Sequence, residues 1–120
     1  MDAQAMRQRT KQYALRIIRV VRSLPRNREC NVIGPQLLRS GTSTAANYRA
    51  VCRARSRADF VAKLGIVEEE CDESLFWMEV LVESGILKEG LLRPLMNEGN
   101  EILAIVVSSK LTARRRGDDS

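Results

Sequence analysis

The chain has 120 residues, 44% of them hydrophobic and 29% charged, which is enough for one domain with a core and excludes a disordered chain. It contains no histidine, and this excludes Ser-His-Asp triads, histidine-ligated zinc sites and Glu-x-x-His di-iron sites. The net charge is +5, from 20 Lys and Arg against 15 Asp and Glu, and the low aromatic content of 4% argues against platforms that stack nucleic-acid bases.

Apolar residues recur every three or four positions through the N-terminal half, which predicts two amphipathic helices. The first is expected over residues 3–24, where Pro25 prevents it from continuing. The second is expected over residues 32–55. We expect Asn31 to cap its start and Pro35 to lie in its first turn, where a missing N–H costs nothing.

The same spacing continues in the C-terminal half and predicts two further helices. The third is expected over residues 57–84, with Ser56 as its N-cap and Gly85 as the left-handed residue at its end. The fourth is expected over residues 90–112. Residues 113–120 are basic and then acidic, and we expect them to form a flexible tail.

Four amphipathic helices joined by short links predict an all-α fold, an antiparallel up-down four-helix bundle that occupies residues 1–112 as a single domain. Residues 41–46 of the second helix are all small, so we expect a neighbouring helix to approach them closely. Three apolar runs cover more than one face of their helices, which favours a homo-oligomer. These runs are residues 76–78, 80–82 and 105–107.

The charge is distributed unevenly along the chain. Residues 1–57 hold thirteen basic and two acidic residues, for a net charge of +11, whereas residues 58–90 hold two basic and nine acidic ones, for −7. Either the arginines of the second helix pair with the acids of the third, inside one bundle or between subunits, or they form a basic face for nucleic-acid phosphates.

Under the second interpretation, the candidates for phosphate contact are arginines that mostly recur every three or four positions and so share a helix face. They are Arg16, Arg19, Arg22, Arg49, Arg53, Arg55 and Arg57. Arg114, Arg115 and Arg116 would form a loose supplementary arm.

No catalytic centre, cofactor site or metal site is predicted. The acids of residues 68–73 are concentrated on one helix, whereas carboxylate metal sites collect ligands from several helices. Serines such as Ser40 and Ser43 have no base to activate them, since histidine is absent. We therefore predict that the protein is not an enzyme and that it requires no cofactor.

The cellular compartment can be predicted from features that the sequence lacks. No apolar run approaches the ~20 residues that a membrane-spanning helix needs, and the N-terminus does not resemble a signal peptide. The three cysteines are an odd number without C-x-x-C spacing, as expected of reduced thiols. These features predict a cytoplasmic protein of a bacterial type that does not contact a membrane.

The most distinctive motifs lie between residues 36 and 85. They read QLLRSGTSTAANYR at 36–49, RARSRADF at 53–60, KLGIVEE at 63–69 and DESLFWME at 72–79. These motifs resemble the four helix bundle protein family, whose members are encoded in intervening sequences of bacterial large-subunit ribosomal RNA genes. Many members carry Glu-Gly where this chain has Ala50-Val51, so any role of that acid does not transfer.

The resemblance implies a bundle with a basic surface that assembles as a homopentamer. The family is also similar to the accessory protein of diversity-generating retroelements, which partners a reverse transcriptase and nucleic acid. What the resemblance implies for partners is therefore self-association, RNA or DNA, and a nucleic-acid-processing protein.

Two functional hypotheses follow. The first is a non-enzymatic, oligomeric helical scaffold that binds nucleic acid, RNA in preference to DNA, through its basic surface. The alternative is a protein–protein interaction module that engages an acidic partner, such as a nucleic-acid enzyme, without touching nucleic acid. A steep loss of nucleic-acid affinity with salt would support the first. Capture of one protein in fixed stoichiometry, insensitive to nuclease, would support the alternative.

Overall fold

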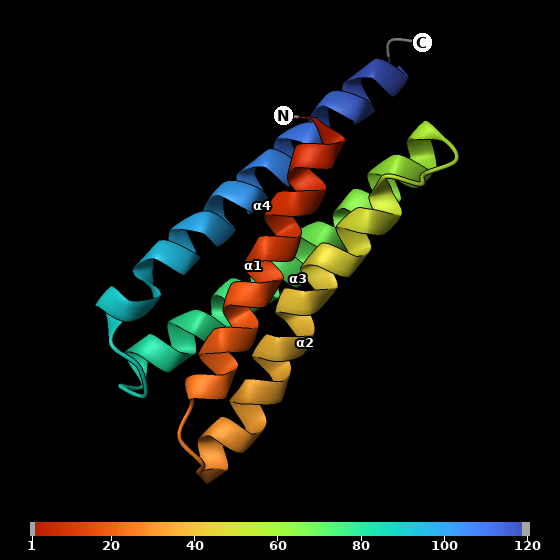
Figure 1. Ribbon diagram of the computed structural model, residues 1–120. Helices are drawn as coiled ribbons and strands as arrows, with labels where there is room; N and C mark the ends of the chain where they lie inside the picture. Colours follow the sequence, from red (N-terminus) through yellow and green to blue (C-terminus); the bar gives the residue numbers. More distant parts are fainter. Residues whose placement is uncertain (1, 119–120) are drawn as a thin grey trace.

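The computed structural model describes residues 2–118, which form four α-helices and, over that range, no strand (Figure 1). The elements are α1 (Ala3–Ser23), α2 (Arg28–Val51), α3 (Arg57–Glu83) and α4 (Glu89–Asp118). They form a rod with principal extents of 53 × 21 × 21 Å. The predicted all-α fold of four helices is confirmed.

Consecutive helices pack side by side along the rod. A Cβ on Gly34, near the start of α2, would lie 3.5 Å from Cδ1 of Leu24, just beyond the end of α1. Further along, Gly41 meets Ile17, so the chain reverses its direction between α1 and α2. Figure 1 shows the N-terminus of α1, the α2–α3 link and the C-terminal end of α4 toward one end of the rod, with the other two links at the opposite end.

The start of α2 differs from the prediction. Asn27 has an extended backbone and its side chain accepts a hydrogen bond from the N–H of Cys30 at 2.8 Å, so Asn27, and not Asn31, is the N-cap. Pro35 is consequently the eighth residue of the helix, where its ring removes the bond to the carbonyl of Asn31. The helix also ends at Val51 instead of residue 55.

The ends of α3 match the signals in the sequence. The hydroxyl of Ser56 accepts a hydrogen bond from the N–H of Asp59 at 3.0 Å, while the Asp59 carboxylate accepts one from the N–H of Arg55. Gly85 has φ of +81°, a conformation that glycine adopts without the strain a Cβ would cause. Ser56 and Gly85 therefore mark the two ends of α3, as expected.

The C-terminal segment differs from the prediction of a flexible tail. α4 continues beyond residue 112 through Arg114, Arg115 and Arg116 to Asp118. No glycine or proline interrupts residues 111–116, and arginine is both a good helix former and favourable near the negative end of the helix dipole. The last two residues of the expected tail, Asp119 and Ser120, lie outside the described residues.

The core contains one buried polar cluster that links three helices. The hydroxyl of Ser74 donates to the carbonyl of Cys71 at 2.6 Å and lies 2.8 Å from the hydroxyl of Tyr13. The thiol of Cys71 donates to the carbonyl of Gly99 at 3.4 Å. Burial raises the pKa of the Cys71 thiol to about 12 and raises the pKa of Tyr13 as well, so both groups stay protonated and serve packing.

Candidate nucleic-acid interface

One arginine of α2 pairs with the acidic helix α3. The guanidinium of Arg39 lies 3.0 Å from the carboxylate of Glu70 and also forms an ion pair with Glu73. The pKa of Glu73 is lowered by the hydrogen bond from Arg39 and, to a smaller extent, by one from the indole N–H of Trp77. The pairing interpretation therefore holds for Arg39.

Two further ion pairs join different helices, and their basic residues are not among the arginines predicted to contact phosphate. Arg9 of α1 donates two hydrogen bonds of 2.7 Å to the carboxylate of Glu98 on α4. Lys110 of α4 lies 2.5 Å from the carboxylate of Glu68 on α3. These pairs tie the bundle together and occupy carboxylates that would otherwise compete for the arginines.

The seven arginines predicted to contact phosphate form no ion pair with the side chains that the structure describes, those of residues 2–117. Six of them are exposed, and Arg16 is half-buried. The hydrogen bond from Arg9 is the main reason that the pKa of Glu98 is lowered, and the nearby charge of Arg16 lowers it further. Arg16 is therefore close to the acidic side chain of Glu98 on α4. The other six therefore keep their charge available to solvent.

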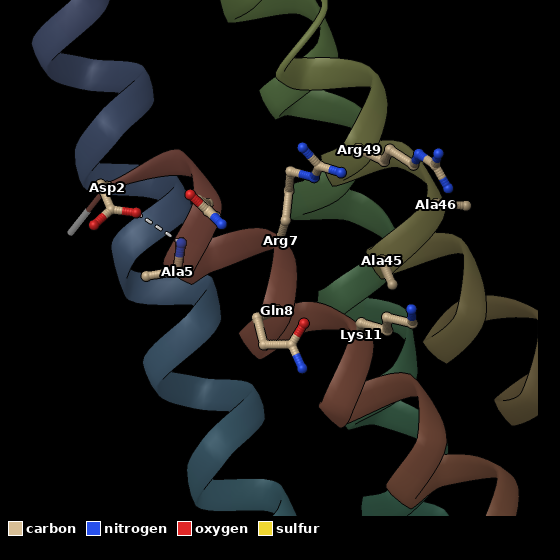
Figure 2. A pocket seen from close by; sticks show the side chains of 9 residues that line it. Asp2, Ala5, Arg7, Gln8, Lys11, Ala45, Ala46 and Arg49 are labelled. Carbon is tan, nitrogen blue, oxygen red and sulfur yellow. Dashed lines mark hydrogen bonds between the residues drawn. The ribbon is translucent and has the colours of Figure 1, made fainter.

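A hollow of about 760 Å³ lies between the start of α1 and the end of α2. Figure 2 shows Arg7 and Lys11 extending from α1 toward the part of α2 that carries Ala45 and Arg49. Gln4, Gln8 and Asp2 complete the rim on the α1 side. Asp2 is also the N-cap of α1, since its carboxylate accepts a hydrogen bond from the N–H of Ala5 at 2.7 Å.

A second hollow, of about 590 Å³, adjoins the first and shares Ala46 and Arg49 with it. Its other positive charges come from two residues of the α2–α3 link, Arg53 and Arg55, and from Lys63 of α3. Asp59 is its one carboxylate among the described lining residues. We call the two hollows together the basic trough. Its six cations are Arg7, Lys11, Arg49, Arg53, Arg55 and Lys63.

The charge of the trough is strongly positive. Its two carboxylates, Asp2 and Asp59, leave a net charge of +4 against the six cations. Lys63 lies 2.6 Å from the carboxylate of Asp59, and this hydrogen bond is the main reason that the pKa of Asp59 is lowered. The other five cations form no ion pair with any residue that the structure describes.

The structure brings together only part of the predicted set. Arg49, Arg53 and Arg55 line the trough, whereas Arg16, Arg19 and Arg22 lie further along α1 and line neither hollow. The side chain of Arg57 lies on the side of α4 instead. A Cβ on Gly117 would be 3.4 Å from Cδ of Arg57.

Three cations of the trough were not among the predicted contacts: Arg7, Lys11 and Lys63. For α1 the sequence holds a signal, because Arg7 and Lys11 are four residues apart and share one helix face. The sequence of α1 alone does not show which helix this face lies beside, because that depends on how α1 packs against α2.

Other kinds of site are not found in the part of the chain that the structure describes. Among the side chains of residues 2–117, no group of three or more Cys, Asp or Glu has an arrangement that could hold a metal ion. None of the described helices is long and apolar enough to cross a membrane. All three cysteines are free thiols, and Cys52 is the exposed one.

Fold and charge together define an all-helical protein of four helices with a basic trough at one end. The chain belongs to the 23S rRNA-intervening sequence protein family, whose family model matches residues 3–108. This confirms the resemblance carried by the motifs of residues 36–85.

A solved structure from Bacteroides thetaiotaomicron, described as a protein of unknown function from the S23 ribosomal protein family, is similar to this chain. The two are 31% identical and superpose with a TM-score of 0.84, over 92% of this chain and 98% of the other. A comparison with curated proteins finds no match. The family has no established function, and the matches indicate no catalytic family.

Proposed function

We propose that the protein is a non-enzymatic, oligomeric helical scaffold that binds nucleic acid, RNA in preference to DNA, through the basic trough. The observation that carries this proposal is the set of five cations there without an ion pair among the side chains of residues 2–117: Arg7, Lys11, Arg49, Arg53 and Arg55. Such cations repel one another, and a polyanion would relieve that repulsion. Phosphates would replace the condensed counterions, whose release drives binding.

The remaining predicted arginines are assigned a supporting role in this proposal. Arg16, Arg19 and Arg22 lie further along α1, outside the two hollows, and Arg57 lies beside the C-terminal end of α4. The arm of residues 114–116 is helical and exposed, toward the end of the rod where Figure 1 shows the N-terminus of α1. A phosphate backbone that leaves the trough could reach these groups.

We further propose that the antiparallel up-down bundle assembles as a homopentamer in the bacterial cytoplasm. Support comes from the family resemblance and from large apolar side chains that the single chain leaves exposed. Val32, Phe76, Leu91 and Leu111 are each at least half exposed, which is costly in water and favours burial against another copy. Five copies would repeat the trough five times, so individually weak contacts would sum.

The direct test is a salt titration of the affinity for fluorescently labelled RNA, followed by anisotropy. Four to five phosphate contacts give a drop in affinity of about 50- to 500-fold between 50 and 200 mM salt, depending on whether the RNA is single-stranded or a duplex. No binding at 50 mM, or an affinity that salt does not change, would contradict the proposal. Multi-angle light scattering with and without nuclease reports the subunit number and any co-purified nucleic acid in the same experiment.

The alternative, a module for an acidic protein partner, predicts a different result from the same preparation. Nuclease treatment would leave a stoichiometric protein partner bound, and labelled RNA would not compete with that partner. Loss of the partner on nuclease treatment would favour nucleic-acid binding.

A further inference from the structure

Positive side chains flank the basic trough on two sides. Arg7 and Lys11 stand four residues apart on α1, as Arg49 and Arg53 do along α2 and its C-terminal turn. At the helical rise of 1.5 Å per residue, Arg7 and Lys11 are about 6 Å apart along the axis of α1. Small side chains line both hollows on the α2 side: Ala45 and Ala46 in the first, and Ala46 and Ala50 in the second. These alanines leave room for an anionic backbone beside the arginines of α2, and Figure 2 shows Ala45 on the side of α2 that faces Arg7 and Lys11.

The trough offers no aromatic ring on which a base could stack. Among the described residues that line the two hollows, none is aromatic. Tyr13 and Tyr48 are buried in the core, and Phe60 is partly buried against it. Phe76 and Trp77 contact each other edge to face, with ring centroids 4.9 Å apart, in the C-terminal half of α3. Proteins that bind single strands depend on such stacking, at about 1–3 kcal/mol per base.

We propose that the basic trough binds the backbone of base-paired nucleic acid in preference to a single strand, independently of base sequence. A duplex carries one phosphate charge per ~1.7 Å of axis and a single strand one per ~3.4 Å, so a surface that recognises charge alone releases more counterions on a duplex. The bases of a duplex already stack on one another and need no aromatic partner. This inference rests on the proposed function, because the same cations make the contacts.

The test compares one RNA 20-mer without self-complementarity in two forms, alone and annealed to its complement, by fluorescence anisotropy at 100 mM salt. We expect the duplex to bind at least 10-fold more tightly, and a duplex of unrelated sequence to bind within twofold of the first. A single strand that binds within threefold of the duplex, or more tightly, overturns the inference while the proposed function stands. Failure of both forms to bind even at 50 mM salt overturns the proposed function itself.

A charge-neutral pair of variants tests whether the duplex occupies the trough. Ala46 is exposed and lines both hollows, so Ala46→Leu occupies space where the two hollows adjoin without altering any charge. Ala62→Leu makes the same change at an exposed position of α3 that lines neither hollow. We expect Ala46→Leu to weaken duplex binding at least fivefold and Ala62→Leu to leave it unchanged, with circular dichroism showing that both fold. Equal affinities of the two variants would place the duplex elsewhere.

Discussion

Gly41 of α2 packs closely against Ile17 of α1, and adding one methyl group there tests how tightly the bundle is packed. A Cβ at this position would lie 2.4 Å from Cδ1, 2.8 Å from Cγ2 and 3.2 Å from Cβ of Ile17. Ile17 is fully buried, and a β-branched side chain in a helix has one strongly preferred rotamer. Rotation of Ile17 therefore cannot relieve all three contacts, and the helices must move apart.

The expected magnitude combines two opposing effects. Overpacking of a well-packed core costs about 1–3 kcal/mol, and the rigidity of Ile17 places Gly41→Ala in the upper half of that range. Replacing glycine by alanine inside a helix stabilises it by about 1 kcal/mol. The net expectation is a loss of about 1–2 kcal/mol in the free energy of unfolding.

Gly65→Ala is the matched control, because Gly65 also lies inside a helix and a Cβ there would meet nothing within 4 Å. We expect this variant to gain about 0.5–1 kcal/mol. The assay is urea unfolding followed by circular dichroism, with the protein concentration held fixed because the proposed assembly would contribute to apparent stability. Adding Ile17→Val, which removes Cδ1, should recover part of the loss in the Gly41→Ala protein. Equal stability of the two alanine variants would refute the close approach of the helices.

Further predictions concern a cap, an ion pair and a proline. Ser56→Ala removes the N-cap of α3 and should cost about 1 kcal/mol in urea unfolding, so an unchanged midpoint would speak against the cap. The hydrogen bonds from Arg9 lower the pKa of Glu98 in the folded protein. The ionised carboxylate therefore stabilises the fold at neutral pH. This stabilisation is lost as the pH falls below the usual glutamate pKa of about 4.3 and through the lower pKa of the folded state. Glu98→Gln should therefore lose about 1–2 kcal/mol at pH 7 and show a shallower decline in stability between pH 5 and 3 than the original protein, whereas parallel curves would contradict the pair. Pro35→Ala restores the hydrogen bond to the carbonyl of Asn31 inside α2 and should raise the free energy of unfolding by about 1–2 kcal/mol. Part of the gain is offset because the unfolded chain becomes more flexible without the proline. A loss of stability would be evidence against an interior position of Pro35.

The number of helices and much of the core follow from periodicity alone. Residues at steps of three and four, such as Ile17, Leu37, Leu64 and Ile102, are buried as the spacing predicts, because a helix packed on one side buries one stripe. The run of small residues around Gly41 was likewise expected to meet a neighbouring helix, and it does so at Ile17.

The start of α2 could not be determined from local signals. Asn27 and Asn31 are both good N-caps, and a proline four residues after Asn31 favours the later start if the helix is considered in isolation. Packing decides between them, since the earlier start buries Cys30 and places Gly34 against Leu24. Tertiary contacts thus outweigh the cost of a proline inside the helix.

The trough was predictable only in part, because it too depends on how neighbouring helices pack. The spacing of Arg49 and Arg53 places them near one helix face, and both line the trough. Arg39 carries the same charge on the same helix, yet its face meets Glu70 on α3, so it forms an ion pair instead. Only the arrangement of neighbouring helices separates an arginine that stabilises the bundle from one that is open to a ligand.

The most direct test of phosphate binding by the trough compares two triple variants that lose the same charge at opposite ends of the rod. One is Arg7→Gln/Arg49→Gln/Arg53→Gln in the trough, and the other is Arg26→Gln/Arg28→Gln/Arg93→Gln at the far end. The measurement is the slope of log affinity for duplex RNA against log salt. We predict that the trough variant binds weakly, with a slope reduced by about 3, and that the far-end variant keeps nearly the original slope. Equal reductions in both variants would contradict binding at the trough, because net charge alone would then account for the affinity.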